Sequence, residues 1–564
     1  METFGKARPE ARRTSATVTR VGRLALLLGA FSLLLLGAAA STLLAGAPAP
    51  GSTTTAPTSS ITTVTSPSVV AVSGHGWGHG LGLSQWGAYG YAKHGWTYDR
   101  ILAHYYTGTT LGPAPVATVR VLLASAKKVT LSSTVPWMVA DSTGTKVQLD
   151  LGALVLTPKL TFADHPELKA PLTFTAKQPL LVNALPYRGR LTVSSDGKLL
   201  QVIDTVGLEA YLKGVVPAEM PSAWAAEALK AQAVAARSYA LANLAKGRPY
   251  DLYGDVRSQV FGGVKAENPA TSAAVDATKG EVVLYRAKVA DALFFSSSGG
   301  RTASALEATG QNVPYLVPVA DPYDTLAPYH DWGPVVMDAS KVAKTLKLAS
   351  ALADIQSVDG ASGRVKSLTM TADDESQVTI NGNQARTAFD LRSTWFTPML
   401  IQLPAQSKTI TYGGAVSLKG RVRNADDVSL EAKAFGVDWA PAGVLVLDAD
   451  GAFATIVKPQ AATQYRLAWG NARVGLVKIA VAPRVDATIV QGTATGKIAP
   501  ALPNAAVQLQ WSADGTTAWQ TLATAATDAT GAFSVSATPQ AGTYRVRVAP
   551  GRGLAPGLSK PVCC

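Results

Sequence analysis

The sequence predicts a mixed α/β (α+β) domain followed by two all-β sandwich domains of immunoglobulin-like type. Three observations carry this prediction. One alanine-rich helical segment stands among strand-like runs between Val69 and Thr397, the chain after Leu403 reads as short alternating strands, and that last part repeats itself once. The 564 residues leave room for about three to five domains of about 100–200 residues. A hydrophobic content of 47 % excludes a wholly disordered chain.

The N-terminus has the form of an export signal. Residues 1–23 hold six basic and two acidic side chains, and residues 24–47 hold no charge. A basic region followed by an apolar run is typical of a secretory leader. Two interpretations of residues 1–47 stay open. The first is a signal peptide cleaved after Ala40, and the second is a membrane anchor, because the uncharged run is long enough to span a bilayer. Both predict a protein that is secreted or held at the cell envelope.

A linker follows, and the charge balance indicates the partners. Residues 48–68 are rich in Thr, Ser and Pro, a composition that does not bury a core.

The net charge is +13, of which the leader supplies four. We expect the other cations to face anionic envelope polymers and no nucleic acid, because no basic cluster is interleaved with aromatic residues. The two cysteines, Cys563 and Cys564, exclude a disulfide-stapled fold and a cysteine zinc site in the core.

Residues 69–400 form the first predicted domain. The strongest helix is expected over Ala223–Ala245, where alanine is by far the commonest residue. Ser222 would cap its start and Gly247 would end it. Strand-like runs lie at Val119–Ser125, Leu191–Asp204 and Glu281–Leu284.

Two copies of one small β domain are predicted after Leu403, at residues 405–484 and 485–560. Aromatic and proline positions recur in the second copy in the same order and at an almost constant spacing. They are Trp439 and Trp519, Phe453 and Phe533, Pro459 and Pro539, and Tyr465 and Tyr544. Short alternating strands with turn signals at this length favour immunoglobulin-like sandwiches. These repeats act either as spacers or as surfaces for envelope glycans or other proteins.

A glycine-rich stretch, GHGWGHGLGLSQWGAYG at residues 74–90, is the first candidate site. Glycine at every second position excludes a stable helix. One interpretation is a surface for sugars, with tryptophans stacking on pyranose rings and polar side chains binding hydroxyl or acetamido groups. The alternative is a glycine-rich turn with packed tryptophans. The two histidines lie about 13 Å apart in an extended strand, too far to share a metal. The candidate sugar contacts are His79, Ser84, Gln85 and Trp86.

The second candidate site is Glu219, just before the predicted helix. Its neighbours Pro217, Ala218, Met220 and Pro221 are apolar. Desolvation by them would raise the pKa of the carboxyl, as a general acid needs, whereas a helix N-terminus would lower it. The alternative role is an acid that only stabilises the start of the helix. Two cations seven residues apart on one helix face, Lys230 and Arg237, are candidates to hold an anionic substrate group or the carboxylate.

These motifs together resemble the stage II sporulation protein D / LytB family (SpoIID/LytB). The matching segments are YLKGVVPAEMP at 211–221, EALKAQAVAARSYA at 227–240 and GHGLGLSQWGA at 78–88. Weaker matches are SQVFGG at 258–263, SSGGRT at 297–302 and PYL at 314–316. The resemblance spans about residues 72–397. It implies that residues 69–400 are a SpoIID-like catalytic domain acting on peptidoglycan glycan strands.

The resemblance also implies a mechanism. Glu219 would be the general acid/base of a lytic transglycosylase that cleaves the MurNAc–GlcNAc bond, since one carboxylate can serve both steps. A muramidase would need a second carboxylate, for which Asp204, Glu209 and Asp255 are nearest in sequence. Tyr239 and Gln259, which lie in the matching motifs, become substrate-binding candidates. The competing function is a non-catalytic, glycan-binding modifier of an N-acetylmuramoyl-L-alanine amidase.

Two departures from the family pattern stand out. The GHG segment lies well before the glutamate in the chain, whereas in sporulation-type members it follows. Some members bind zinc with a histidine where this chain has Phe295. We therefore expect neither metal nor another cofactor.

Overall fold

The computed structural model describes residues 66–162, 164–516 and 518–563. The predicted leader and most of the linker lie outside the described residues. No helix in the described part of the chain is long and apolar enough to cross a membrane. The chain divides into two compact units. Residues 69–400, predicted as one domain, contribute to both. The first holds residues 118–215 and 243–266, and the second holds residues 66–117, 216–242 and 267–563.

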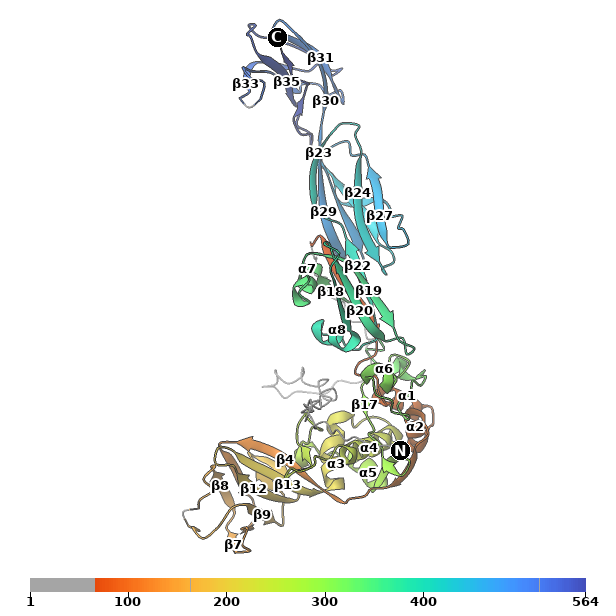
Figure 1. Ribbon diagram of the computed structural model, residues 1–564, viewed down its shortest axis with the longest axis vertical. Helices are drawn as coiled ribbons and strands as arrows, with labels where there is room; N and C mark the ends of the chain where they lie inside the picture. Colours follow the sequence, from red (N-terminus) through yellow and green to blue (C-terminus); the bar gives the residue numbers. More distant parts are fainter. Residues whose placement is uncertain (1–65, 163, 517, 564) are drawn as a thin grey trace, which may run out of the picture. The chain divides into compact units, whose positions relative to one another are not determined.

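The first unit is built on two antiparallel-rich sheets (Figure 1). The seven-stranded sheet runs β14(Leu252–Tyr253), β4(Thr118–Ala126), β13(Leu200–Gly207), β12(Arg190–Ser195), β9(Leu172–Ala176), β6(Trp137–Ala140), β7(Lys146–Leu149). The four-stranded sheet runs β11(Leu185–Tyr187), β10(Leu180–Val182), β5(Val129–Ser133), β8(Gly152–Leu156). The run Leu191–Asp204, predicted as strand, is a hairpin, because Asp196 accepts the backbone N–H groups of Lys198 and Leu199 and turns the chain.

The helix α3 (Leu208–Glu219) carries the chain from the first unit into the second. The sequence does not predict this helix, because Gly214 and Pro217 are unfavourable inside helices. The predicted long helix is α4 (Ala226–Ala242), shorter at both ends than expected. Ser222 is not its N-cap, since Trp224 N–H donates to the Pro221 carbonyl in an intervening turn.

The helical part of the second unit packs around α4 and is joined by short strands. Alanine side chains let α4 approach its neighbours closely, and Ala231, Val234 and Ala235 share one core with Leu102 and Tyr105. The helices are α1(Gln85–Lys93), α2(Tyr98–Tyr105), α5(Pro269–Ala277) and α6(Ala305–Thr309). The strands form the sheets β16(Lys288–Val289), β15(Glu281–Tyr285), β3(Thr110–Pro113) and β17(Phe294–Phe295), β2(Leu83–Ser84).

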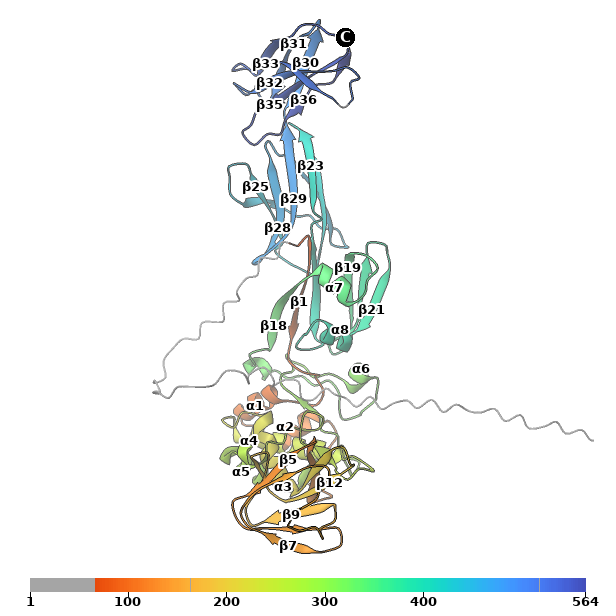
Figure 2. The same cartoon turned by 90° about the vertical axis from the view of Figure 1, so that its left-hand side faces the viewer.

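A five-stranded sheet continues the second unit, with β1 beside β18 (Figure 2). Its order is β18(Asp331–Asp338), β1(Ser68–His75), β22(Phe396–Gln402), β24(Val416–Arg423), β27(Ala452–Val457). Because β22 pairs with β24, the sheet runs on across the predicted boundary between residues 400 and 405. Next to it stand β19(Leu352–Asp359), β20(Val365–Ala372), β21(Gln377–Asn381), α7(Ala339–Thr345) and α8(Gly382–Ala388).

Each C-terminal repeat consists of two sheets that enclose one core. The first repeat pairs β24 and β27 with the sheet β23(Gln406–Thr411), β29(Ala472–Ala482), β28(Thr463–Trp469), β25(Ser429–Ala434), β26(Ala440–Val444). The second pairs the sheet β30(Arg484–Val490), β31(Thr493–Ala499), β34(Ala532–Ser536) with the sheet β33(Gln520–Ala526), β32(Ala506–Ser512), β35(Thr543–Ala549), β36(Gly557–Leu558). Phe453 and Phe533 lie on corresponding strands, as do Tyr465 and Tyr544. The immunoglobulin-like strand arrangement stays a prediction.

Candidate functional site

Glu219 is the last residue of α3, not a residue before a helix start. The negative end of a helix dipole disfavours a carboxylate, so the dipole works in the direction opposite to the one expected from sequence. The side chain is half-buried, and desolvation by its surroundings raises the pKa of Glu219 to about 7. The carboxyl is therefore divided between its acid and base forms near neutral pH, which suits a proton donor that later accepts a proton.

Gln85 joins the glycine-rich stretch to Glu219. It is the first residue of α1, and its Nε2 donates to the backbone carbonyl of Glu219 at 2.9 Å. The same nitrogen lies 3.3 Å from Oε1 of Gln232, a fully buried residue of α4. Two motifs that are distant in the sequence thus meet at the end of α3. The amide fixes the backbone that carries the acid.

Three aromatic rings lie near the end of α3 that carries this acid. Trp86 and Trp224 have centroids 4.6 Å apart, and Tyr89 stacks on Trp224 at 4.7 Å. Met220, the residue after Glu219, packs in the same cluster as Tyr89 and Trp224. All three rings are half-buried and keep exposed surface. Sequence reasoning missed Tyr89 and Trp224, although a tryptophan shortly after the glutamate was a usable signal.

His79 holds the glycine-rich loop together and does not offer a nitrogen to a sugar. Its Nδ1 accepts the Leu81 N–H at 3.0 Å, and its Nε2 donates to the Phe294 carbonyl at 3.0 Å. Burial, with the nearby Arg386, lowers the pKa of His79 to about 3, so the ring is neutral. With 6 % of the residue exposed, the predicted sugar contact is corrected to a structural role.

Ser84 is likewise corrected from a sugar contact to a helix cap. It is fully buried, and its Oγ accepts the Gly87 N–H at the start of α1 and donates to Asp324 at 2.9 Å. The cap orients the first turn of α1, where Gln85 and Trp86 lie.

Asp324 is a residue that sequence reasoning missed. The carboxylate is fully buried and accepts hydrogen bonds from Ser84, from Ser297 Oγ and from the backbone N–H groups of Ser298 and Gly299. It therefore ties the glycine-rich stretch to the Ser-Ser-Gly-Gly motif. Neighbouring Asp321 accepts from Tyr105, and burial next to Asp324 raises the pKa of Asp321 to about 7.

Arg237 and Lys230, predicted to act together, do different things. Arg237 is fully buried and donates to the carbonyls of Glu281 and Val275, which fastens α4 to β15 and α5. Lys230 pairs with Glu227 at 2.7 Å, one helical turn away. For Arg237 the predicted contact with substrate is therefore corrected to a structural role.

Tyr239 and Gln259 lie in different units. Burial and the charges of Asp291 and Glu219 raise the pKa of Tyr239 to about 12, so its hydroxyl stays protonated beside the acid. Gln259 is buried in the first unit, where its Oε1 accepts the Tyr211 hydroxyl at 3.2 Å.

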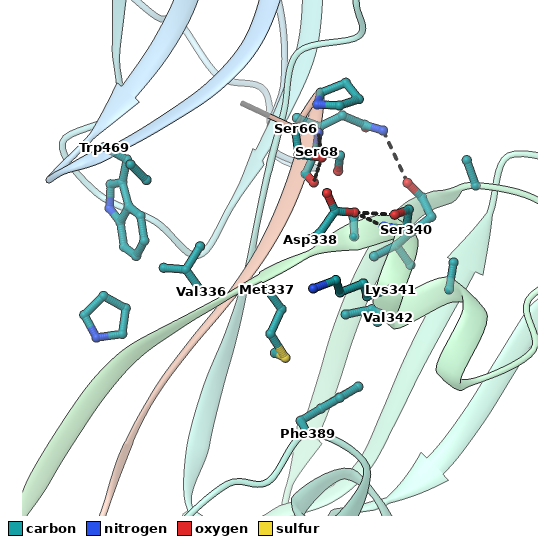
Figure 3. Close-up of a pocket in the computed structure, with 18 of the residues that line it drawn as sticks. Ser66, Ser68, Val336, Met337, Asp338, Ser340, Lys341, Val342, Phe389 and Trp469 are labelled. Carbon is teal, nitrogen blue, oxygen red and sulfur yellow. Dashed lines mark hydrogen bonds between the residues drawn. The ribbon is translucent and has the colours of Figure 1, made fainter. Parts of the chain in front are cut away.

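A large cavity of the second unit lies elsewhere. It measures about 2000 Å³ and is lined by β1, β18, α7 and the turn between β28 and β29. Figure 3 shows Val336, Met337 and Trp469 on its wall and Asp338 bonded to Ser340. None of the predicted site residues lines it. Within the described residues, no three His, Cys, Asp or Glu side chains are grouped to hold a metal.

Comparisons with known proteins agree with the motifs. Residues 196–285 match the family model described as SpoIID, stage II sporulation protein. An uncharacterized protein of Brachyspira hyodysenteriae is 37 % identical over 151 residues, 26 % of this chain and 41 % of that one. The amidase enhancer of Bacillus subtilis is 42 % identical over 113 residues, 20 % of this chain and 15 % of that one. Stage II sporulation protein D of Bacillus subtilis is 31 % identical over 145 residues, 23 % and 42 % of the two chains.

The chain thus spans less than half the length of each of these relatives. Among solved structures, a cytokine receptor complex is 17 % identical and covers 26 % of this chain and 94 % of that one, with a TM-score of 0.17. A TM-score this low assigns no fold.

Proposed function

Because this chain belongs to the SpoIID/LytB family, we propose that it is an exported enzyme that remodels peptidoglycan, with Glu219 as its acid/base. The activity proposed is that of a lytic transglycosylase, which cleaves MurNAc–GlcNAc strands without water. The observation that carries the proposal is the half-buried carboxyl of Glu219, whose pKa is raised to about 7, at the end of α3 where the next residue, Met220, packs on a cluster of half-buried rings.

Glu219 would serve two steps in turn. In its acid form it donates a proton to the glycosidic oxygen, and the bond from that oxygen to the anomeric carbon of MurNAc breaks. The resulting carboxylate then takes the proton of the MurNAc 6-hydroxyl as that oxygen bonds to the anomeric carbon. The product carries a 1,6-anhydro ring, and Glu219 is protonated again. No second carboxylate is needed, which distinguishes this reaction from hydrolysis.

The other residues of the site position the carboxyl of Glu219 and the substrate. Gln85 holds the carbonyl of Glu219 and so fixes the end of α3. Trp86, Tyr89 and Trp224 offer apolar ring surface near the end of α3, on which sugar rings can lie. The protonated hydroxyl of Tyr239 is a hydrogen-bond donor near the carboxylate. Lys230 remains a candidate for a substrate anion at the edge of α4.

The proposal is tested by incubating the purified protein with peptidoglycan and identifying the released muropeptides by mass spectrometry. We expect 1,6-anhydro ends from the wild type and none from Glu219→Gln, which keeps the shape of the side chain. Glu209→Gln is the matched control and should retain activity. New reducing ends would indicate a muramidase, and binding without any product would contradict catalysis.

A second candidate is a non-catalytic modifier of an N-acetylmuramoyl-L-alanine amidase. The 42 % identity to the amidase enhancer of Bacillus subtilis favours it. In that case the protein should raise the release of stem peptides by an amidase, and Glu219→Gln should raise it equally.

Export, with residues 24–47 as leader or anchor, is part of the proposal. Fractionation of cells into cytoplasm, membrane and medium tests it.

A further inference from the structure

The two β repeats carry the same stack of an arginine on a tryptophan. The guanidinium of Arg466 lies 3.8 Å from the ring centroid of Trp439, and that of Arg545 lies 3.9 Å from Trp519. Each arginine also donates through Nε to the neighbouring strand. The acceptor is Glu431 at 2.7 Å in the first repeat and Gln510 at 2.9 Å in the second.

In the first repeat this stack has a carboxylate beside it. Oε2 of Glu431 accepts from Arg466 and also lies 3.2 Å from Nε of Arg473. One carboxylate therefore faces two guanidinium groups, so the three side chains together keep one net positive charge, and all three are less than one-third exposed. The arginine of the stack is itself paired with a carboxylate, which leaves it less available to an anionic ligand.

In the second repeat the carboxylate is replaced by amides. Gln510 accepts from Arg545, and Gln508 accepts from Arg547 at 3.1 Å. The strands β32, β33 and β35 contain no Asp or Glu. Within the described residues neither arginine forms an ion pair, and burial together with repulsion from Arg547 lowers the pKa of Arg545. The same scaffold therefore holds two uncompensated positive charges.

These side chains lie on the face of the sheet away from the core, where Gln510 is buried beneath its neighbours and Trp519, Arg545 and Arg547 are half-buried. Val507 and Leu509 on β32 and Val546 and Val548 on β35 lie in the core. Because side chains alternate along a strand, the residues between them face away from the core. Arg545 and Arg547 stand about 7 Å apart on the same strand. We call the set Gln508, Gln510, Trp519, Arg545 and Arg547 the arginine face.

We propose that the arginine face binds a polysaccharide that carries carboxylate groups. Two guanidinium groups held close together by neutral partners repel each other, and an anionic ligand would relieve that repulsion. A planar guanidinium matches a carboxylate through paired hydrogen bonds. The half-buried indole of Trp519 adds apolar surface on which a sugar ring can lie. A flexible polymer of glycerol phosphate has no such ring. This site is independent of Glu219.

The chain supplies its own charge-swap test. Gln510→Glu places a glutamate at the position where the first repeat has Glu431. The same arrangement of strands therefore already accommodates that side chain. Glu431→Gln is the matched control in the first repeat. Binding of the full-length protein to polygalacturonate is measured by calorimetry, with neutral chito-oligosaccharide and poly(glycerol phosphate) as comparison probes. Thermal melting confirms that each variant is folded.

We expect the wild type to bind polygalacturonate more tightly than either comparison probe, and binding to weaken as salt is added. Gln510→Glu should lower the affinity about tenfold, because a charge-assisted contact is lost, and Glu431→Gln should not lower it. Arg547→Gln gives a second loss variant should Gln510→Glu melt early. Wild-type affinity in folded Gln510→Glu, or tighter binding to the phosphate polymer, overturns the proposal.

Discussion

Replacing Glu219 by its neutral isostere glutamine changes how the stability of the protein depends on pH. In the folded chain desolvation raises the pKa of Glu219 to about 7, whereas in the unfolded chain it returns to about 4.3. Between these pH values the folded chain holds a proton that the unfolded chain has released. The free energy of unfolding of the wild type therefore falls as the pH rises through this window.

The size of the effect follows from the shift. One pKa unit corresponds to about 1.4 kcal/mol, so the full shift would cost the folded chain about 4 kcal/mol above pH 8. Because Glu219 is half-buried and keeps some water, we expect about 1–3 kcal/mol. Glutamine is neutral at every pH. The stability of Glu219→Gln relative to the wild type should therefore increase by this amount from about pH 4 to about pH 8.

Urea unfolding followed by tryptophan fluorescence at several pH values measures this difference. Burial also raises the pKa of Asp204 to about 8 and that of Asp321 to about 7. Both residues are present in the wild type and in Glu219→Gln, so their contributions cancel in the difference between the two free energies of unfolding. A difference that stays constant from pH 4 to pH 8 would refute a raised pKa of Glu219. A change of the opposite sign would mean that its carboxylate is stabilised by the fold.

Three further outcomes are expected. Asp324→Asn loses acceptors for several buried donors and should lower the free energy of unfolding by about 2–4 kcal/mol, measured by urea unfolding; an unchanged midpoint would contradict its tying role. Trp224→Ala removes ring surface near the end of α3 and should raise KM for glycan about threefold to tenfold at nearly constant kcat, with Trp439→Ala as control. Gln85→Leu frees the carbonyl of Glu219 and should lower kcat about tenfold or more, whereas a change in KM alone would argue against positioning.

Patterns that depend on neighbours in the sequence were predictable. The alanine-rich composition identified α4, and the spacing of Phe453 and Phe533 identified the two β repeats, because both signals are repeated along the chain. The helix α3 was missed, since its stability comes from burial of residues such as Tyr211 and outweighs the local cost of Pro217. The pairing of β22 with β24 skips the intervening strand β23, and local patterns do not reveal it.

Glu219 and Gln85 were singled out from their motifs, and the structure brings them together. Gln85 was expected to contact a sugar, whereas its amide donates to the backbone carbonyl of Glu219. The motif also contains His79 and Ser84, which face inward and hold the loop. A motif shows which residues act together but not which of them face solvent. Asp324 was missed because its partners come from two distant segments that meet only in the folded chain.

In the proposed mechanism, Glu219 directs attack by a hydroxyl of the substrate and not by water. Digestion of peptidoglycan in oxygen-18-labelled water, followed by mass spectrometry of the new ends, distinguishes the two nucleophiles. We expect 1,6-anhydro ends that carry no oxygen-18 from the wild type, and no new ends from Glu219→Gln. New reducing ends that carry oxygen-18, or cleavage by Glu219→Gln at the wild-type rate, would contradict this mechanism.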